Sequence, residues 1–485
     1  MKIFPAIGEA RALAAGYPAV PVYATLPEDT RDPVETFLVL KNLSKQCFIL
    51  ESLENADRRG RYTFLGYDPR AGITCTDGHL TIDAGMRVEV ETRDPGAYIQ
   101  KVVDDYRAPR LPELPPFSGG LVGYFAYDYI TYAEPSLDLT AADEEGFRDV
   151  DLMLFDKVIA YDHVSNVIFL VVNIRTDALE ENYNKAVSEI GYLARLIATG
   201  TRAELPPLRL TSPWRELFDE AGYAAMVERA KHHIVEGDIF QAVLSNRLDA
   251  DAEGSLFETY RRLRVINPSP YMFYFSSDDL EIAGASPETL VTLRDGVATT
   301  FPLAGTRPRG ATPQEDEALE AELLADPKEL AEHRMLVDLG RNDIGKIARI
   351  GSVGVDVSMA VLRYSHVMHI GSVVSGRVRE GVSATEVIGA VLPAGTLSGA
   401  PKIRACQIIN ELEGVKRGVY GGAIGYLGLT GDLDTCIAIR IAYKKNGKVF
   451  VRSGAGIVAD SVPAREYAET RAKIGAVVKA LEDQQ

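Results

Sequence analysis

The sequence predicts an α+β protein in which antiparallel β-sheets pack as a sandwich with helices on the outside and two intertwined domains. Three observations support this fold class. Turn dipeptides at Asp77-Gly78, Asp295-Gly296 and Asn446-Gly447 separate β-rich runs, as in antiparallel hairpins. Segments of helical periodicity lie between the sheet segments. The 485 residues also exceed the roughly 250–300 residues that one hydrophobic core supports.

Proline-rich stretches mark the organisation of the chain. Residues 204–213 form one of them, and they follow a helical pattern that ends near Gly200. We therefore place a boundary near residue 205, between an N-terminal domain (1–205) and a C-terminal domain (206–485). Apolar spacing and helix-start signals predict four helices in the second domain, Ala221–Glu236, Pro327 to about Gly340, Ser383–Leu392 and Pro463–Leu481.

Composition restricts the function classes. The chain is 46% hydrophobic and 25% charged, which is typical of a globular protein, and its formal charge is −17. This charge argues against nucleic acid or an anionic membrane as partner, and an anionic substrate needs a local positive site. No signal-peptide core, membrane span or paired cysteine spacing is recognisable, so a cytoplasmic location is expected.

Two pairs of glutamates repeat one spacing at two predicted helix starts. Glu329 and Glu332 follow Asp326-Pro327, and Glu466 and Glu469 follow Pro463. Each pair alone has an ordinary explanation, since Glu329 fits a capping box and acidic i, i+3 pairs are common on solvated faces. Together, four carboxylates from two helices suit a hard cation such as Mg2+.

Several further segments offer candidate binding groups. Glycines in Arg452-Ser453-Gly454-Ala455-Gly456 follow a strand and allow a ligand to approach the backbone, although a plain turn also explains them. Arg440 emerges from an apolar strand, where burial is costly without a partner such as a carboxylate. Other positive candidates lie in loops, at Arg307, Arg309 and Lys402.

Proton transfer near neutral pH has few histidine candidates. His369 lies on an apolar strand, where a hydrogen-bonded core histidine is the ordinary interpretation, and His333 is expected to face elsewhere than Glu332. Neither a Gly-x-Cys-x-Gly nor a Gly-x-Ser-x-Gly nucleophile elbow is present in the sequence. The chain therefore favours acid, base and metal chemistry.

These motifs together resemble the chorismate-utilising enzymes, and within them the anthranilate synthase large subunits. The resemblance is strong over about residues 220–480 and weaker before residue 200, where Leu50-Glu51-Ser52 and Gly119 to Tyr124 carry it. The matching segments of the strong region are Gly237 to Gln241, Gly284 to Glu288, Pro302 to Gly310, Glu332-His333, Asp338 to Asp343, Gly395 to Lys402 and Glu466 to Glu469.

The resemblance implies a Mg2+ site and a substrate site. Glu332 and Glu469 would bind Mg2+, and Glu329 and Glu466 would act mainly through metal-bound water. The metal would hold the ring carboxylate of chorismate. Implied chorismate contacts are Gly305, Thr306, Tyr420, Arg440 and the backbone of Gly454, Ala455 and Gly456, with Thr396 and Lys402 close by.

The implied reaction is attack of ammonia at ring C2 with loss of the C4 hydroxyl, followed by elimination of pyruvate to give anthranilate. Glu288 matches the general acid, which needs a raised pKa, and His369 is assigned to the elimination. Gln241 replaces the lysine base of isochorismate-forming relatives, and Ala304 replaces the lysine of aminodeoxychorismate synthases. Both residues favour anthranilate.

The resemblance also implies two partners. Because no glutaminase cysteine is recognisable, ammonia would come from a separate glutamine amidotransferase subunit. L-tryptophan would inhibit by binding at Ser52, Pro270, Tyr271 and Met272, although Pro268 and Pro270 also suit an ordinary edge-strand turn. Aminodeoxychorismate synthase and a catalytically silent tryptophan-binding subunit are the alternatives.

Overall fold

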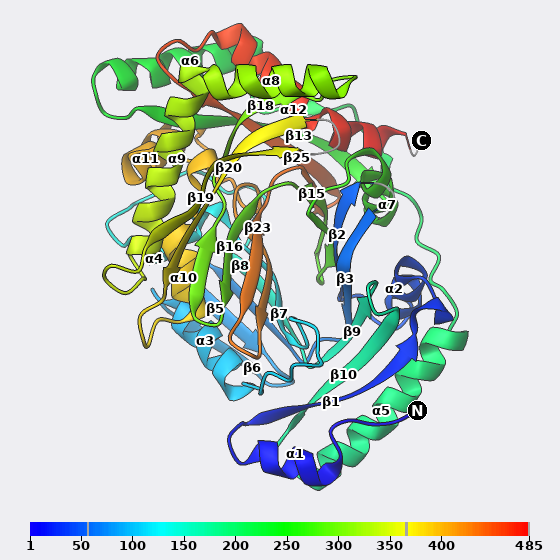
Figure 1. Ribbon diagram of the computed structural model, residues 1–485. Coiled ribbons are helices and arrows are strands. Elements are labelled where there is room, and N and C mark those ends of the chain that lie inside the picture. Colours follow the sequence, from blue (N-terminus) through cyan, green and yellow to red (C-terminus); the bar gives the residue numbers. More distant parts are fainter. Residues whose placement is uncertain (56–57, 364–366, 484–485) are drawn as a thin grey trace.

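Two large antiparallel sheets organise the computed structural model, with helices packed on their outer faces (Figure 1). The structure describes residues 1–55, 58–363 and 367–483. The α+β sandwich predicted from the sequence is confirmed. Each sheet contains strands from both sides of residue 205, so the two predicted domains share both sheets, while the boundary itself stays a prediction.

The first sheet has 13 strands and runs from an edge formed by early residues to one formed by late residues. β14 pairs with β2, which joins the N-terminal and C-terminal halves of the chain. Along the sheet the strands are β1 (Ala19–Pro27), β10 (Val167–Arg175), β9 (Lys157–Asp162), β3 (Arg58–Tyr67), β2 (Cys47–Asn55), β14 (Tyr271–Ser276), β15 (Leu280–Ser286), β24 (Ile441–Lys445), β25 (Lys448–Ile457), β13 (Gln241–Glu253) and β11 (Arg209–Leu210), with β12 (Arg215–Glu216) and β21 (Gly399–Ala400) on β13.

The second sheet has 12 strands and joins the two halves where β22 pairs with β7. Its long strand β20 pairs with β17 and β18 and also with β19. Along the sheet the strands are β18 (Leu303–Pro308), β20 (Val367–Arg377), β17 (Val297–Thr300), β16 (Thr289–Arg294), β23 (Leu433–Ile437), β22 (Ala423–Gly428), β7 (Gly120–Phe125), β8 (Val150–Phe155), β4 (Ala71–Thr76), β5 (His79–Asp83) and β6 (Arg87–Glu91), with β19 (Gly354–Arg363) on β20.

Helices cover the outer faces of both sheets. The four predicted helices are confirmed as α6, α9, α10 and α12, with ends shifted by a few residues. The helices are α1 (Ile7–Ala14), α2 (Pro33–Lys41), α3 (Pro95–Asp105), α4 (Ile130–Ala133), α5 (Leu179–Thr199), α6 (Glu220–Val235), α7 (Phe257–Ile266), α8 (Pro313–Ala325), α9 (Pro327–Gly345), α10 (Ala384–Val391), α11 (Lys402–Glu413) and α12 (Pro463–Glu482), with 3-10 turns η1 (Glu28–Thr30), η2 (Tyr127–Tyr129) and η3 (Gly395–Leu397).

The core between the two sheets is rich in aromatic side chains. Phe48 of the first sheet packs edge-on against Phe155 of the second, with ring centroids 4.7 Å apart. Phe117 lies 4.4 Å from Tyr426 by the same measure. Such pairs fix how the inner faces interdigitate and add stabilisation beyond the apolar area they bury. Separate apolar clusters lie between each sheet and its helices.

The predicted hairpin turns are confirmed at all three dipeptides. Each first residue, Asp77, Asp295 or Asn446, has φ near +50°, and the glycine that follows it is also positive. Two consecutive positive φ angles are those of a type I′ turn, whose twist matches the twist of the flanking strands. The turns connect β4 to β5, β16 to β17 and β24 to β25.

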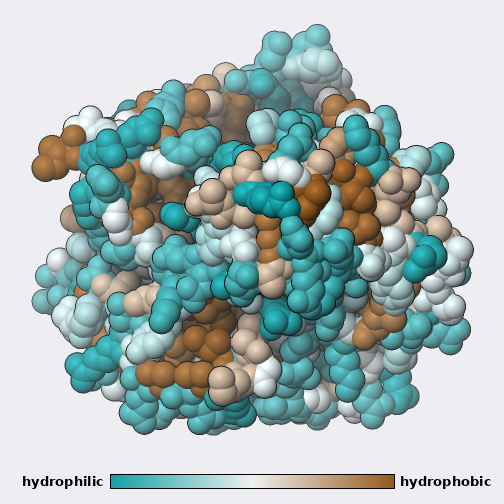
Figure 2. Space-filling model, turned by 90° about the horizontal axis from the view of Figure 1, so that it is seen from below, coloured by the Kyte–Doolittle hydropathy of each residue, from teal (hydrophilic) through white to brown (hydrophobic). Residues whose placement is uncertain are grey.

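The face of the molecule seen in Figure 2 is mostly hydrophilic, with apolar residues in separate patches. Patches of this kind are normal on globular proteins. Within the described ranges, no helix has the length and apolar character needed to cross a membrane.

A buried carboxylate with two guanidinium partners ties helix α11 to the first sheet. Glu413, at the end of α11, accepts hydrogen bonds from Arg417 at 2.5 Å and from Arg452 of β25 at 2.6 Å. It also accepts the Ser245 amide of β13 at 2.7 Å. All three charged side chains are at most 2% exposed. Removing the carboxylate would leave two buried cations unpaired.

Replacing this carboxylate tests its contribution to stability. Glu413→Gln should lower the free energy of unfolding by about 3–5 kcal/mol, because the size is kept and the charge is lost. Glu411→Gln is a matched control, since Glu411 pairs with Arg229 at 2.6 Å on the exposed face of the same helix and should change stability by less than about 1 kcal/mol. Urea denaturation measures both, and equal losses would contradict the assignment.

Candidate active site

A cavity of about 240 Å³ gathers most of the predicted catalytic and substrate-binding residues. It lies where β18, β20 and the start of β16 in the second sheet meet β25 of the first sheet and helix α12. The predicted residues that line it are Glu288, Ala304, Thr306, His369, Thr396, Tyr420, Arg440 and Gly454. They come from segments that span more than a third of the chain, and the folded sheets bring them to one place.

Glu288 is the acid of this cavity. It directly precedes β16, and its carboxyl accepts a hydrogen bond of 3.0 Å from the hydroxyl of Thr396 in η3. Its backbone carbonyl accepts the Ile437 amide at 2.9 Å, which fixes the strand start. Burial raises the pKa of Glu288 to about 7, and Thr396 and the more distant Lys473 only partly offset this. The group is therefore suited to donate a proton near neutral pH.

His369 of β20 lies beside the neighbouring strand β18, in register with Thr306. Its Nδ1 lies 2.9 Å from the Gly305 carbonyl and 3.1 Å from the Thr306 hydroxyl. Gly305 has φ of 70° and lies at a bulge in the β18–β20 pairing, which brings its carbonyl to the ring. Burial lowers the pKa of His369, and Arg440 lowers it further. The imidazole is thus neutral at pH 7 and can accept a proton.

Arg440 and Tyr420 supply polar groups for an anionic ligand. Burial lowers the pKa of Arg440, which marks a guanidinium with too little compensating charge. The sequence suggested a carboxylate partner for Arg440, but among the described residues no carboxylate forms an ion pair with it. Burial raises the pKa of Tyr420 to about 12, so its hydroxyl stays a donor.

The Gly454 to Gly456 segment differs from its prediction. It lies inside β25, not after a strand, because pairing with β13 continues through these residues. Gly454 lines the cavity, and a Cβ there would meet the Leu244 carbonyl at 2.8 Å. A Cβ on Gly456 would meet the Gln241 amide nitrogen at 2.5 Å. These glycines therefore allow close packing around Gln241 and the cavity, while Ala455 points into an apolar cluster.

The two glutamate pairs lie on helices α9 and α12, near the same two lysines, Lys328 and Lys473. Burial and the nearby Glu329 raise the pKa of Glu332, and burial and Glu469 raise that of Glu466. Lys328 and Lys473 act on both Glu332 and Glu466, which indicates that the pairs approach each other. The Asp326 cap is confirmed, and Glu329 contacts Arg307 at 3.5 Å.

The donor chemistry of these pairs fits a hard cation, because the like charges of each pair, which contribute to the raised pKa of Glu332 and of Glu466, are relieved by added positive charge. In the part of the chain that the structure describes, no three Asp, Glu, His or Cys side chains are arranged as a metal site. A bound anion and water would therefore have to supply ligands.

Gln241 is buried next to the first glutamate pair. It is 5% exposed and its side chain hydrogen bonds to Glu332. The carbonyl oxygen of its side-chain amide, Oε1, has no hydrogen-bond partner among the described residues. A neutral amide at this position provides no base.

Lys473 is a site residue that the sequence interpretation did not single out. Its ammonium donates to the Gly454 carbonyl at 3.0 Å and pairs with Glu469 at 2.7 Å, and it lines the cavity. The sequence contains a signal that indicates this residue, since Lys473 follows Glu469 by four residues and lies on the same helix face.

Three predicted positive candidates lie outside the cavity. Arg307 pairs with Asp326 and Glu322, both at 2.9 Å, and Arg309 pairs with Asp316. Lys402 is 8% exposed and donates to Asp343 at 2.8 Å. Nearby carboxylates therefore neutralise all three, and none contacts the cavity.

The residues predicted to bind tryptophan line a second cavity, of about 350 Å³. Ser52 of β2 and Pro270, Tyr271 and Met272 at β14 meet there. The Tyr271 hydroxyl donates to Asp434 at 2.7 Å and lies 3.0 Å from the Thr289 hydroxyl. Because Thr289 follows Glu288, one strand start separates this cavity from the active-site cavity.

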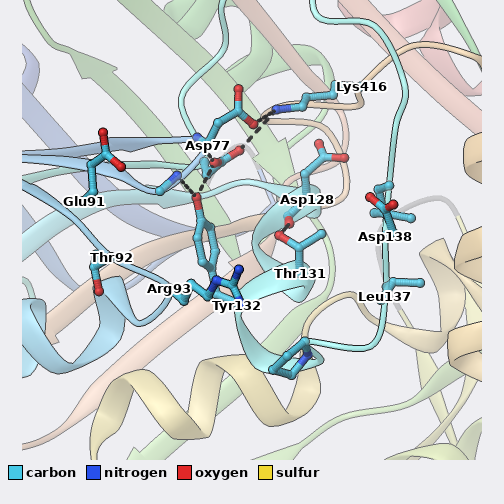
Figure 3. A pocket seen from close by; sticks show the side chains of 14 residues that line it. Asp77, Glu91, Thr92, Arg93, Asp128, Thr131, Tyr132, Leu137, Asp138 and Lys416 are labelled. Carbon is cyan, nitrogen blue, oxygen red and sulfur yellow. Dashed lines mark hydrogen bonds and ion pairs between the residues drawn. The ribbon is translucent and has the colours of Figure 1, made fainter.

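A larger cavity, of about 890 Å³, contains none of the predicted residues (Figure 3). Within it, Lys416 is bonded to Asp77 at 2.6 Å, and the Tyr132 hydroxyl donates to Asp149 at 2.7 Å. The Lys416 carbonyl accepts Arg452 at 3.0 Å, so its backbone supports a residue of the active-site wall.

The cavity thus combines a carboxyl of raised pKa, a neutral histidine and a guanidinium without a carboxylate partner among the described residues, a set of groups that suits an enzyme. The chain belongs to the family of chorismate binding enzymes, whose model matches residues 45–479.

Curated relatives match nearly the whole chain. Anthranilate synthase component 1 of Acinetobacter calcoaceticus is 44% identical, with 96% of each chain covered. The protein of that name from Aquifex aeolicus is 43% identical, covering 99% of this chain and 98% of the relative.

Two solved structures superpose on this chain over most of its length. Anthranilate synthase component I from Streptococcus pneumoniae superposes with a TM-score of 0.74 at 39% identity, covering 86% of this chain and 92% of that one. The menaquinone-specific isochorismate synthase of Escherichia coli has a TM-score of 0.71 at 20% identity, with 98% of each chain covered, and shows the shared fold alone.

The raised pKa of Glu288 predicts a pH-dependent stability. A carboxyl whose pKa rises from 4.5 to about 7 on folding contributes less stability as pH increases through that range, because the unfolded state ionises first. The substitution Glu288→Gln removes the ionisable group and with it this decrease in stability at higher pH. Its stability relative to the native protein should increase by about 1 kcal/mol between pH 6 and pH 8.5. Urea denaturation at both pH values checks this, and a constant difference would contradict the raised pKa.

Proposed function

We propose that this chain is the large subunit of anthranilate synthase and converts chorismate and ammonia to anthranilate and pyruvate. The observation that carries the proposal is Glu288, a half-buried residue whose carboxyl has a pKa near 7, in a cavity that also contains the uncompensated Arg440. The names of the relatives support the same activity.

The first half of the reaction needs an acid. Arg440, Tyr420 and Lys473 hold the carboxylates of chorismate in the cavity. Ammonia attacks ring C2 while the protonated Glu288 donates its proton to the C4 hydroxyl, which leaves as water. Gln241 provides no base, and ammonia requires none because it is already a nucleophile.

The second half needs a base. The neutral His369 takes the proton from C2 as the bond between C3 and the enolpyruvyl oxygen breaks, and the ring becomes aromatic. The released enolpyruvate takes a proton at its methylene carbon to give pyruvate, and the ammonium formed at C2 gives up one proton to solvent. The Gly305 carbonyl and the Thr306 hydroxyl orient its ring. Ala304 leaves the wall without an amine, which favours amination at C2 over C4.

Incubation with chorismate, ammonium and Mg2+ tests the function. Anthranilate should form and be detected by its fluorescence, and Glu288→Gln should lower kcat by about 10²–10⁴-fold because proton donation is lost. The product 4-amino-4-deoxychorismate or isochorismate would reject the assignment, and no turnover would favour the silent subunit.

Mg2+ is the proposed cofactor, held directly by Glu332 and Glu469 and through water by Glu329 and Glu466. When bound, the ion would anchor and polarise the ring carboxylate. The raised pKa values of Glu332 and Glu466 support an incoming cation.

Removing one ligand tests the metal. Glu332→Gln should abolish Mg2+-dependent turnover and weaken Mg2+ binding measured by calorimetry about 10–100-fold. Glu317→Gln, at an exposed position on α8, should behave like the native protein. Full activity of Glu332→Gln at low Mg2+ would exclude this ligand set.

A separate glutamine amidotransferase subunit is the proposed source of ammonia, since no nucleophile elbow occurs in this sequence. L-tryptophan is the proposed inhibitor, bound in the cavity of Ser52 and Pro270 to Met272. Thr289 lines that cavity while Glu288 lines the active site, so an occupant could favour an inactive conformation of the strand start.

Tryptophan should inhibit turnover and raise the melting temperature of the native chain, because a ligand that binds only the folded state stabilises it. Ser52→Leu, which fills the cavity, should remove both effects. Differential scanning fluorimetry and the fluorescence assay measure them. If saturating tryptophan changes neither the turnover nor the melting temperature of the native chain, the regulatory proposal is wrong.

A further inference from the structure

A small chamber lies behind the Glu288–Thr396 hydrogen bond, on the side away from Arg440. Its volume is about 30 Å³, and both Glu288 and Thr396 line it as well as the active-site cavity. The rest of the wall is largely apolar, with Phe301, Leu336 and Leu339 among its side chains. The two residues thus form a partition between the substrate cavity and the chamber.

The chamber matches water in size and polarity. A water molecule needs at least about 10–15 Å³ of such space and two to four polar partners. The Glu288 carboxyl, the Thr396 hydroxyl and the carboxylate of Asp343 all line the chamber and supply those partners. A larger ligand is excluded by the 30 Å³ volume.

Asp343 and Lys402 form a buried ion pair at the other end of the chamber. The Lys402 ammonium donates to Asp343 at 2.8 Å and to the Val391 carbonyl at 2.9 Å. Their side chains are 10% and 7% exposed. Burial raises the pKa of Asp343, and Lys402 opposes the shift. No step of the proposed reaction uses this pair, although burying two charges is costly.

The chamber points toward solvent on the Asp343 side. Lys346, which follows the last residue of α9, lines a surface groove of about 630 Å³ between α3, α4 and α10. Ala390 of α10 lines the same groove, and the next residue, Val391, lines the chamber. Short segments of two helices therefore separate the chamber from the surface.

We propose that this chamber holds a water that returns a proton to Glu288 after each turnover, with Asp343 and Lys402 as the residues that position it. The inference rests on the proposed role of Glu288 as general acid. Glu288 loses one proton when the C4 hydroxyl leaves as water, and until the product leaves, the ring keeps solvent from reaching Glu288 through the substrate cavity.

The proton balance is simple. The Glu288 carboxylate takes a proton from the chamber water, and solvent returns one proton to that water by way of the Asp343 carboxylate. No other co-reactant is needed. Lys402 keeps Asp343 oriented and charged, and Thr396 holds the Glu288 oxygen at the partition.

The test compares Asp343→Asn with the native chain in the ammonium-dependent reaction. The substitution should lower kcat about tenfold or more, which is less than the loss expected on removal of the general acid itself, because Asp343 acts through a water. It should also raise the solvent deuterium isotope effect on kcat and leave KM for chorismate unchanged. A merely structural pair would alter the melting temperature and leave the isotope effect as it was.

Two further variants keep the test decisive if Asp343→Asn folds poorly. Leu339→Phe fills the chamber, and the double variant Asp343→Leu/Lys402→Met removes both charges while keeping apolar packing. Both should show the same kinetic signature. Asp338→Asn, on the exposed face of α9 with a 68% exposed side chain, is the matched control and should behave like the native chain.

Native kcat and isotope effect in Asp343→Asn or in Leu339→Phe would overturn the proposal. Failure of the native chain to make anthranilate would instead reject the proposed function, so the two failures are distinguishable.

Discussion

The active site depends on keeping the Glu288 carboxyl out of water beside a cavity that must attract anions. Burial raises its pKa, which stays at about 7 although Thr396 and Lys473 lower it, and a cation in direct contact would reverse the shift. The structure holds Lys473 back from it, because Lys473 is bonded to Glu469 and to the Gly454 carbonyl. Positive charge and protonated acid therefore coexist in one cavity.

The second requirement is that two sheets keep their spacing around that cavity. Glu413 fixes Arg452 of β25 and Arg417, whose guanidinium also donates to the carbonyls of Leu397 and Val243. Arg417 lies over the Tyr420 ring at 5.9 Å, so this buried charge cluster supports the wall that carries Tyr420. Local backbone irregularities then orient individual groups, as the bulge at Gly305 brings its carbonyl to the His369 ring.

Much of the fold was readable from the sequence, because Asp-Gly and Asn-Gly turns and helix starts at Pro327 and Pro463 are local signals. The family resemblance named most cavity residues, whose metal, catalytic and tryptophan roles stay predictions. Long-range pairing escaped local reasoning: β25 continues through Gly454 to Gly456, and Lys402 finds Asp343 from another helix. Lys473 was missed although its pairing with Glu469 on the same helix is a local signal, and its contact with the Gly454 carbonyl joins two distant segments.

The proposed chemistry depends on Glu288 being protonated near neutral pH before substrate arrives. Infrared difference spectra between the native chain and Glu288→Gln, recorded from pH 5.5 to 8.5, isolate the carbonyl band of this one carboxyl. The account predicts a protonated-acid band that disappears with a midpoint near pH 7. A carboxylate that is already ionised at the lowest pH of the series would contradict it.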